Sequence, residues 1–356
     1  MGNRHGRLQA LHLPPDQNPY QRLLFGGLSS HGVGCDLHRG HLSELLVGPV
    51  VRRHDVLHVH WLHRYFAGQS RLRGYARGLL LLVVLTYWRM RKRRVVWTVH
   101  NLGHHEGERP GFDRVLSTAV AHLAHVVVSH SAAGRLAIAR RFKVRPSKVV
   151  VALHGNYCSI VDAPPVQSED RSGARFLFFG QIRRYKGVEE LVEAFEKLDG
   201  EHRLRIAGQV REDGLRRLLE AAAARDGRID LDLRFLPDED LVQHLAWSSI
   251  VVLPFTRSFS SGSLLFALSA GRGVILPDIS YLRDYLDEEA TVTYPTTGRQ
   301  ALHEALQQVT GRDHTAMGLA ARQHAERFDW ARVSGAVADA YCRPIERRFP
   351  LRRSTR

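Results

Sequence analysis

The sequence has 356 residues, 44% hydrophobic and 24% charged, which argues against a disordered chain and against a polytopic membrane protein. Lys and Arg outnumber Asp and Glu by 51 to 36, a formal net charge of +15. This favours phosphates, nucleic acid or anionic lipid as partners, unless it reflects arginine-rich codon usage alone. The cysteines Cys35, Cys158 and Cys342 are far apart and odd in number, so they indicate neither a disulfide framework nor a zinc site and fit a reducing cytoplasm.

The chain alternates short β-branched or aromatic runs with helical patterns, which predicts an α/β fold with two doubly wound, Rossmann-like domains. The predicted strands of the first half are RLQALHL, DVLHVHWL, RVVWTVHNL, HVVVSH and KVVVALHG. Those of the second half are RFLFFGQI, HRLRIAGQV, IDLDLRFL, SIVVLPF and GVILPDI. A proline-rich and charged stretch, 159–175, indicates a linker, so we expect domains at 1–160 and 161–330 and a last segment at 331–356. Ligands are expected in the cleft between the domains, beyond the carboxyl ends of the strands.

The start of the chain, MGNRHGRLQALHLPP, lacks the apolar core and cleavage site of a secretory signal, so we expect a cytoplasmic protein. Asn18 and Tyr20 follow the first predicted strand, where Asn18 either binds a sugar or phosphate or starts the next helix with Pro19. His60 and Trp61 end the next predicted strand, and the indole either stacks on a sugar ring or belongs to the core.

Residues 71–94, RLRGYARGLLLLVVLTYWRMRKRR, form a leucine-rich helix with basic flanks. Its apolar run is about half the roughly 20 residues that span a bilayer, so a transmembrane helix is not expected. Such a helix either lies on an anionic membrane surface or is a buried helix of the first domain.

The histidine-rich stretch HNLGHHE, residues 100–106, follows a predicted strand at its carboxyl end. His104, His105 and Glu106 can bind a ligand or move a proton. His100 either joins them or bonds to the backbone at the strand end. No further residues follow at zinc spacing, so a metal site is not expected.

A basic turn separates the predicted strand RFLFFG from an amphipathic helix that starts at Val188. The turn carries four polar candidates, Gln181, Arg183, Arg184 and Lys186. Exposed N–H groups and the positive end of the helix dipole favour phosphate there, and the cations would add to this attraction. The alternative is a solvated basic turn.

A second strand, small-residue loop and helix follow in LPFTRSFSSGSLLFALSAGRGVILPD. This loop offers hydroxyls and unhindered N–H groups to phosphate oxygens from Ser260, Ser261, Gly262 and Ser263. The alternative interpretation is that Ser261 simply caps the helix. Two such turns at equivalent strand ends of one domain favour a nucleotide diphosphate.

These motifs together resemble the GT-B glycosyltransferases of family four, which transfer sugars from nucleotide donors. The resemblance rests on FFGQIRRYKGVEELVEAF, RIAGQV, VVLPF and ALSAGRGVILPD, and it covers nearly the whole chain. In the first half, NPYQRLL, LHVHWL and TVHNLGHHE look like the acceptor domain of bacterial polysaccharide and glycolipid members.

The resemblance implies a role for several residues. Lys186 matches the lysine that holds the donor diphosphate, while Gln181 replaces the usual arginine, so that Arg183 or Arg184 supplies the second charge. His100 matches a histidine near the donor sugar. The family's two glutamates, eight positions apart, correspond here to Ser258 and Phe266, which implies altered recognition of the donor.

The implied activity is metal-independent hexosyl transfer, without a cofactor beyond the nucleotide-sugar donor. The acceptor would be a glycan, a polyprenyl-linked sugar or a small molecule, bound through Asn18, Tyr20, His60 and Trp61. In this fold the last helix crosses back to the first domain. Two alternatives stay open: a sugar-nucleotide epimerase and a non-catalytic GT-B partner subunit. Nucleic-acid binding is not expected, because no known module is present.

Overall fold

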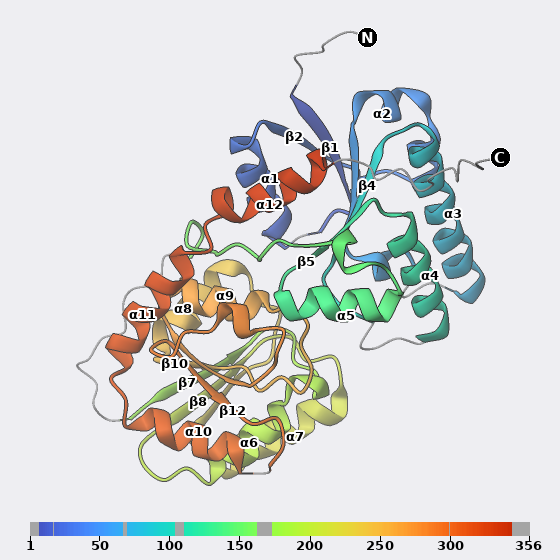
Figure 1. Ribbon diagram of the computed structural model, residues 1–356. Coiled ribbons are helices and arrows are strands. Elements are labelled where there is room, and N and C mark those ends of the chain that lie inside the picture. Colours follow the sequence, from blue (N-terminus) through green and yellow to red (C-terminus); the bar gives the residue numbers. More distant parts are fainter. Residues whose placement is uncertain are drawn as a thin grey trace, which may run out of the picture. The chain divides into compact units, whose positions relative to one another are not determined.

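A computed structural model describes residues 7–16, 18–66, 70–103, 110–161, 173–298 and 300–343. These residues form two compact units. The first unit contains the chain up to residue 153 together with the segment from residue 330 onward, and the second contains residues 154–329. Each unit, within the described residues, has a six-stranded parallel sheet with helices on both faces, so the predicted α/β class is confirmed (Figure 1).

The sheet of the first unit has the strand order β2-β1-β3-β4-β5-β6. Its strands are β1 (Leu8–Leu13), β2 (Val33–Leu37), β3 (Val56–Val59), β4 (Arg94–Val99), β5 (Val126–Ser129) and β6 (Val149–Val151). Five of them were expected from the sequence. The edge strand β2, VGCDL, was missed because only Val33 is buried and its apolar pattern is weak.

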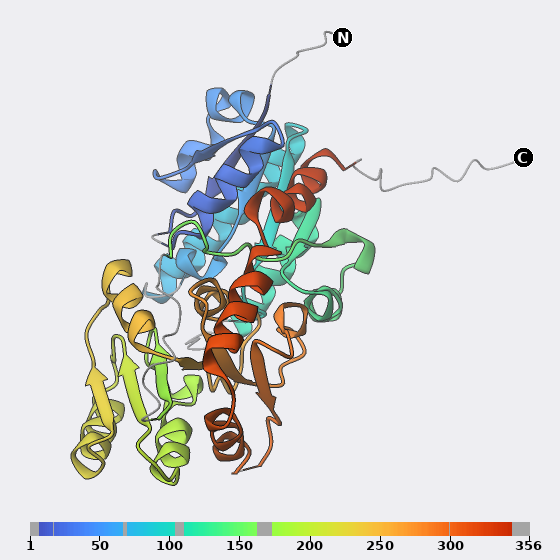
Figure 2. The same ribbon diagram turned by 90° about the vertical axis from the view of Figure 1, so that its left-hand side faces the viewer.

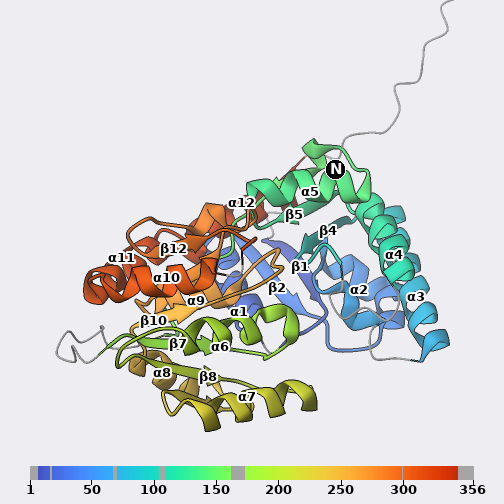
Figure 3. The same ribbon diagram turned by 90° about the horizontal axis from the view of Figure 1, so that it is seen from below.

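Helices cover both faces of this first sheet. They are α1 (Tyr20–Ser30), α2 (Gly48–Arg53), α3 (Arg71–Met90), α4 (Pro110–Leu123), α5 (Ala132–Phe142) and α12 (Trp330–Cys342). Helices α1 and α12 lie side by side over one face (Figure 2). Helices α3, α4 and α5 form a row on the other (Figure 3). The α1–α12 contact is close, since a Cβ on Gly27 would approach the carbonyl oxygen of Trp330 to 2.4 Å. The last helix therefore belongs to the first unit, as the resemblance implied.

The sheet of the second unit has the strand order β12-β11-β10-β7-β8-β9. Its strands are β7 (Arg175–Phe179), β8 (Arg203–Ala207), β9 (Ile229–Asp232), β10 (Ile250–Val252), β11 (Gly273–Pro277) and β12 (Thr291–Tyr294). Only the edge strand β12 was not expected, because TVTY is short and half of it is threonine.

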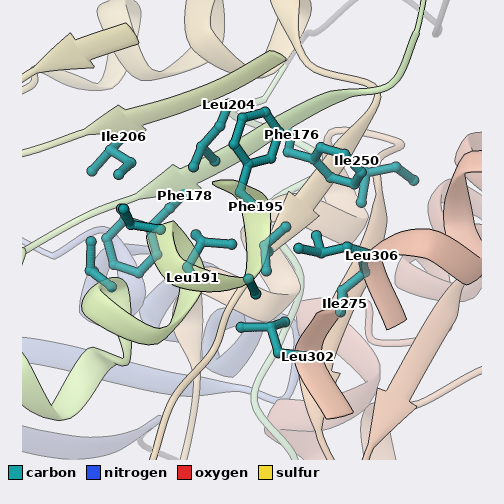
Figure 4. Packing of buried hydrophobic residues seen from close by; sticks show 14 of the residues in the cluster. Phe176, Phe178, Leu191, Phe195, Leu204, Ile206, Ile250, Ile275, Leu302 and Leu306 are labelled. Carbon is teal, nitrogen blue, oxygen red and sulfur yellow. The ribbon is translucent and has the colours of Figure 1, made fainter. Parts of the chain in front are cut away.

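The core of the second unit lies between its sheet and helices α6 (Val188–Glu196), α7 (Asp213–Arg225) and α10 (Ala301–Thr310) (Figure 4). Helices α8 (Asp238–Trp247), α9 (Gly262–Ser269) and α11 (His314–Glu326) complete the unit. Phe176, Phe178 and Phe195 are fully buried in this core. Burial of each such side chain stabilises the fold by about 1.5–3 kcal/mol, so this sheet is a firm support for the loops at its edge.

Candidate functional site

The second unit has a topological switch point between β7 and β10. These strands are neighbours, yet the chain continues from β7 to β8 on one side and from β10 to β11 on the other. Loops at such a point diverge and leave a crevice beyond the carboxyl ends of the two strands, where open α/β sheets bind ligands. The two candidate phosphate turns of the sequence follow β7 and β10, so the fold brings them to the same place.

The two turns are held together by backbone contacts. Thr256, after β10, donates both its N–H and its Oγ1 hydroxyl to the carbonyl oxygen of Tyr185, at 3.1 and 2.8 Å. Gly187 has a φ of +71°, and a Cβ there would lie 1.9 Å from the carbonyl oxygen of Pro254. Only glycine combines this left-handed conformation with so close an approach. Helix α6 begins directly after it.

Lys186 is half-buried in the first of these two turns. Its Nζ is 4.2 Å from the centroid of the Phe255 ring, and burial lowers the pKa of the ammonium group to about 8. Within the described part of the chain, no carboxylate lies within ion-pair distance of it. A cation held this way gains from an anionic ligand, which would restore the charge interaction that desolvation removes.

The other polar residues of the first turn differ in their exposure and in their ion pairs. Arg184 is exposed and forms ion pairs with Glu189 and Glu212, at 2.6 and 3.3 Å. Arg183 is half-buried and Gln181 is exposed. Of the two arginines proposed as the second charge, Arg184 therefore already has carboxylate partners.

The serine loop after β10 leads into helix α9. Ser261 caps the helix, its hydroxyl accepting the N–H of Leu264 at 3.1 Å. Gly262 and Ser263 form the first turn of α9, and Ser263 Oγ is 4.0 Å from the position of a Cβ on Gly180 in the other loop. The capping role of Ser261 is thus present, and the N-terminus of α9 faces the switch point.

Tyr157 supports this loop, although no sequence motif pointed to it. Its hydroxyl lies 3.1 Å from the position of a Cβ on Gly262, and its ring packs at 5.2 Å against Phe266. Phe266 is buried, and the Ser258 hydroxyl donates to the carbonyl oxygen of Ser260 at 3.1 Å. At the two positions where the resembled family has glutamates, Ser258 therefore stabilises the loop and Phe266 belongs to the core.

The first unit contains a buried cluster of imidazoles on the three neighbouring strands β1, β3 and β4. Strand side chains alternate between the two faces of a sheet, and the parallel register places His12 beside His58. One face therefore carries His12, His58, His60, Thr98 and His100, all buried. Helices α1 and α12 cover this face, and Tyr341 of α12 reaches into the cluster.

These side chains form a continuous hydrogen-bonded chain. It runs from Thr98 Oγ1 to His58 Nε2 (2.7 Å) and from His58 Nδ1 to the Tyr341 hydroxyl (2.6 Å). From there it continues to His12 Nε2 (3.4 Å), from His12 Nδ1 to His60 Nε2 (3.0 Å), and from His60 Nδ1 to His100 Nε2 (3.3 Å). We call this set the histidine chain.

Burial keeps these imidazoles neutral. It lowers the pKa of His12 to about 3 and that of the adjacent His130 to about 4, and it lowers the pKa values of His58 and His60 well below the ordinary value. The cause is desolvation of the imidazolium form, to which neighbouring imidazoles add for His58 and His60. His12, His58 and His60 are therefore neutral rings within the histidine chain.

His12, His58 and His60 also have nitrogens within 4.8 Å of one another, close enough to hold a metal ion. Two observations favour the hydrogen-bonded chain. Both His58 nitrogens already contact hydroxyls, and the rings of His58 and His60 stack at 4.2 Å with an interplanar angle of 26°. Ligands of one ion instead turn their nitrogens toward a common centre.

The structure brings most of the first-half candidates together around His100. The Trp61 ring stacks on His100 at 4.4 Å, and Tyr20 meets it edge-on at 5.0 Å. Tyr20 and His60 are buried, and Trp61 is half-buried. Exposed Asn18 lies just before α1, and its side-chain oxygen accepts the N–H of Tyr20 at 2.9 Å. His104 and Glu106 lie outside the described residues.

A cavity of about 620 Å³ opens in the first unit beside the ends of β1 and β2. Its lining includes Pro14, Arg39, Arg64, Arg77 and Leu80. Arg64 forms an ion pair with Asp16 at 2.9 Å. The cavity is rich in cationic side chains and borders helix α3.

Helix α3 has two different faces. Leu81, Val84, Leu85 and Trp88 are buried against the unit. An exposed apolar stripe, formed by Leu72, Leu79, Val83 and Met90, runs along the other side. Both interpretations of residues 71–94 thus have a basis in the helix. Across the described residues, no helix combines the length and the apolar character that crossing a bilayer requires.

Part of the sequence is similar to known glycosyltransferases. Residues 173–311 match the family described as Glycosyl transferases group 1. A GDP-mannose:glycolipid 4-beta-D-mannosyltransferase of Xanthomonas campestris pv. campestris is 33% identical over 229 residues, which is 64% of this chain and 62% of the relative. A D-inositol 3-phosphate glycosyltransferase of Corynebacterium kroppenstedtii is 27% identical over 266 residues, covering 66% of this chain and 57% of the relative. The chain thus matches less than two thirds of the length of these relatives.

Solved structures resemble the chain over nearly its whole length. Sucrose-phosphate synthase from Thermosynechococcus elongatus has a TM-score of 0.70 at 17% identity, covering 94% of this chain and 98% of its own. HepE from Anabaena, in complex with UDP-glucose, has a TM-score of 0.69 at 15% identity, covering 94% and 99%. These structures show that the chain has the GT-B fold, and residues 173–311 resemble the family described as Glycosyl transferases group 1.

Proposed function

We propose that this protein is a glycosyltransferase, of family four within the GT-B fold, that moves a hexosyl group from a nucleotide-diphosphate sugar to a hydroxyl group. The observation that carries this proposal is the pair of turns at the switch point of the second unit, where Lys186 and the N-terminus of α9 lie after neighbouring strands. A similar donor is named for the Xanthomonas relative, and a UDP-sugar is bound in the Anabaena structure.

The proposed chemistry is the departure of a nucleoside diphosphate. Negative charge grows on the phosphate that leaves the sugar carbon, and fixed positive groups lower that barrier. Lys186 supplies a full charge, while the N–H groups of Gly262 and Ser263 supply partial charges at the helix end. Because protein groups provide this stabilisation, we propose a reaction without a catalytic metal and without a further cofactor.

The proposed role of His100 is to contact the reacting sugar, with His104 and Glu106 on the same segment as further candidates. In the resembled family a histidine at this position lies near the donor sugar. His100 ends a rigid strand and is packed between Trp61 and Tyr20, so its orientation is well defined. Trp61 and Asn18 are the more accessible of the acceptor candidates.

For the acceptor we propose a lipid-linked or other anionic glycan, taken at the inner face of the plasma membrane. Three arginines line the cavity beside α3, and the exposed stripe of α3 lies on a helix with basic ends. This combination suits an amphiphile with a phosphoryl head and an apolar tail. The name of the Xanthomonas relative likewise specifies a glycolipid acceptor.

The donor site can be tested by calorimetric titration of UDP, GDP, dTDP and ADP against the whole protein and its Lys186→Ala variant. We expect one nucleotide to bind and its affinity to fall by about tenfold or more in the variant, as for loss of a charged contact. Lys197→Ala, which removes an exposed lysine from the end of α6, is the matched control and should leave binding unchanged. If no nucleotide binds to any of the three proteins, the donor site is wrong and a non-catalytic subunit becomes the better description.

A further inference from the structure

We propose that the histidine chain holds His100 in the tautomer with its proton on Nε2, so that Nδ1 is the proton-accepting nitrogen, and that Tyr341 of the last helix is a positioning residue for this state. The proposal rests on the proposed function, in which His100 acts at the sugar. It concerns a property of the free protein, however, and can be tested without a substrate.

A neutral imidazole has one N–H donor and one acceptor nitrogen, so each ring in the histidine chain can donate one hydrogen bond and accept one. In the chain, both nitrogens of His58, His12 and His60 have a partner. Where two rings face each other, one nitrogen must donate and the other must accept, so His12, His60 and His100 share one tautomer. The Tyr341 hydroxyl has one proton and two acceptor positions, so it either donates to one of its two neighbours and accepts from the other, or accepts from both. Three arrangements are therefore consistent: all four histidines protonated on Nε2, all four protonated on Nδ1, or His58 protonated on Nδ1 and the other three on Nε2.

The two hydrogen-bond lengths of the Tyr341 hydroxyl distinguish these arrangements. The Tyr341 hydroxyl lies 2.6 Å from His58 Nδ1 but 3.4 Å from His12 Nε2. A phenol is the stronger donor, and O–H donors make shorter hydrogen bonds than N–H donors. The short contact is therefore the one in which Tyr341 donates to His58 Nδ1. It follows that His58 donates Nε2–H to Thr98 and that His12, His60 and His100 each carry the proton on Nε2.

The histidine chain ends at the hydroxyl of Thr98. Thr98 is fully buried, and a threonine hydroxyl is not basic enough to keep an extra proton. Passage of a net proton along the chain would also create an imidazolium where burial disfavours it. The chain therefore sets a tautomer and conducts no proton. A neutral His100 could change to the Nδ1–H tautomer only if His60 and His12 changed with it.

The test is two-dimensional NMR of ¹⁵N-histidine-labelled full-length protein, which reports the protonated nitrogen of each ring. We expect His12, His58, His60 and His100 all to be neutral and protonated on Nε2. Protonation of any of the four on Nδ1, or a mixture of tautomers, would overturn the proposal. So would a stoichiometric divalent cation whose removal shifts His12, His58 and His60 together.

The Tyr341→Phe variant tests the positioning role. It leaves the Nε2–H of His12 without an acceptor, and an unpaired buried donor is less tolerated than an unpaired acceptor. We therefore expect His12, His60 and His100 to change to the Nδ1–H tautomer. Tyr294→Phe, at another buried tyrosine, is the matched control and should leave all four rings unchanged. If Tyr341→Phe does not fold, Thr98→Val serves instead and should give His58 a mixture of tautomers; an unchanged spectrum in the folded variant overturns the inference.

Activity separates this inference from the proposed function. If sugar transfer is found, Tyr341→Phe should lower kcat about a hundredfold, the usual contribution of a proton acceptor, while the donor KM stays unchanged. A purely structural role would leave the tautomers of the folded variant as they are. Failure of nucleotide binding would count against the proposed function alone, whereas failure of the tautomer prediction would count against the histidine chain alone.

Discussion

The hydroxyl of Tyr341 lies 2.6 Å from Nδ1 of His58, although 283 residues separate them in the sequence. The contact joins the last helix, α12, to the centre of the first sheet. It completes a buried network of imidazoles and hydroxyls. Both the stability of this unit and the state of His100 depend on that arrangement.

Acid should destabilise the first unit through these rings. Their folded pKa values lie below the ordinary 6.5, so the unfolded state binds more protons at acid pH. The stabilisation is complete above pH 6.5 and is lost as pH falls, by up to about 1.4 kcal/mol per pH unit for each ring. Hydrogen exchange, corrected for intrinsic rates, should show β1, β3 and β4 losing protection between pH 6.5 and 5. Strands β7 and β10 are the internal control, and equal protection of β3 at both pH values would contradict the prediction.

Nucleotide binding should weaken at alkaline pH because of Lys186. Its pKa is about 8 in the free protein, and a bound diphosphate stabilises the ammonium form. Affinity should therefore be constant below pH 8 and fall by up to tenfold per unit above it. Titrations at pH 7 and pH 9 measure this, and Lys186→Ala should show a flatter dependence. The same slope in both proteins would assign it to another group.

Gly187→Ala should disrupt the crevice between the two turns. The substitution forces a left-handed φ on alanine and places a Cβ 1.9 Å from the Pro254 carbonyl oxygen, so the turns must separate. We expect about 1–3 kcal/mol of lost stability in urea unfolding, together with loss of nucleotide binding. Gly227→Ala is the matched control, since nothing lies within 4 Å of a Cβ there. A Gly187→Ala protein that binds nucleotide normally would show that this contact does not shape the site.

Vesicle binding should depend on the exposed stripe of α3. The Leu79→Glu substitution places a negative charge in the middle of that stripe. The carboxylate would lose its hydration when the stripe inserts into the membrane interface, and it would repel anionic lipid. In co-sedimentation with vesicles of phosphatidylcholine and phosphatidylglycerol, we expect binding to fall about tenfold or more. Leu136→Glu places the same charge on exposed α5 and should have little effect. Equal losses in both variants would mean that overall charge decides binding.

The sequence was most informative where the chemistry is local. Ten of the twelve strands among the described residues were recognisable, because buried parallel strands are short apolar runs between turn residues. Strand β2 was missed because only Val33 in it is buried, and β12 because it is short and half threonine. The turn that ends at Gly187 and the serine loop were also recognisable, since small and basic residues between a strand and a helix already suggest a phosphate site.

The tertiary structure decided which of these residues meet. Strand order placed the turns after β7 and β10 side by side at a switch point, and no local pattern specifies that order. Pairing of β1, β3 and β4 aligned histidines that are 40 or more residues apart, and the return of α12 added Tyr341. The sequence by itself therefore determined the fold class and the two strand–turn–helix segments proposed to bind phosphate, which depend on neighbouring residues. The histidine chain depends on long-range packing of buried polar groups that must satisfy one another, and only the folded chain could establish it.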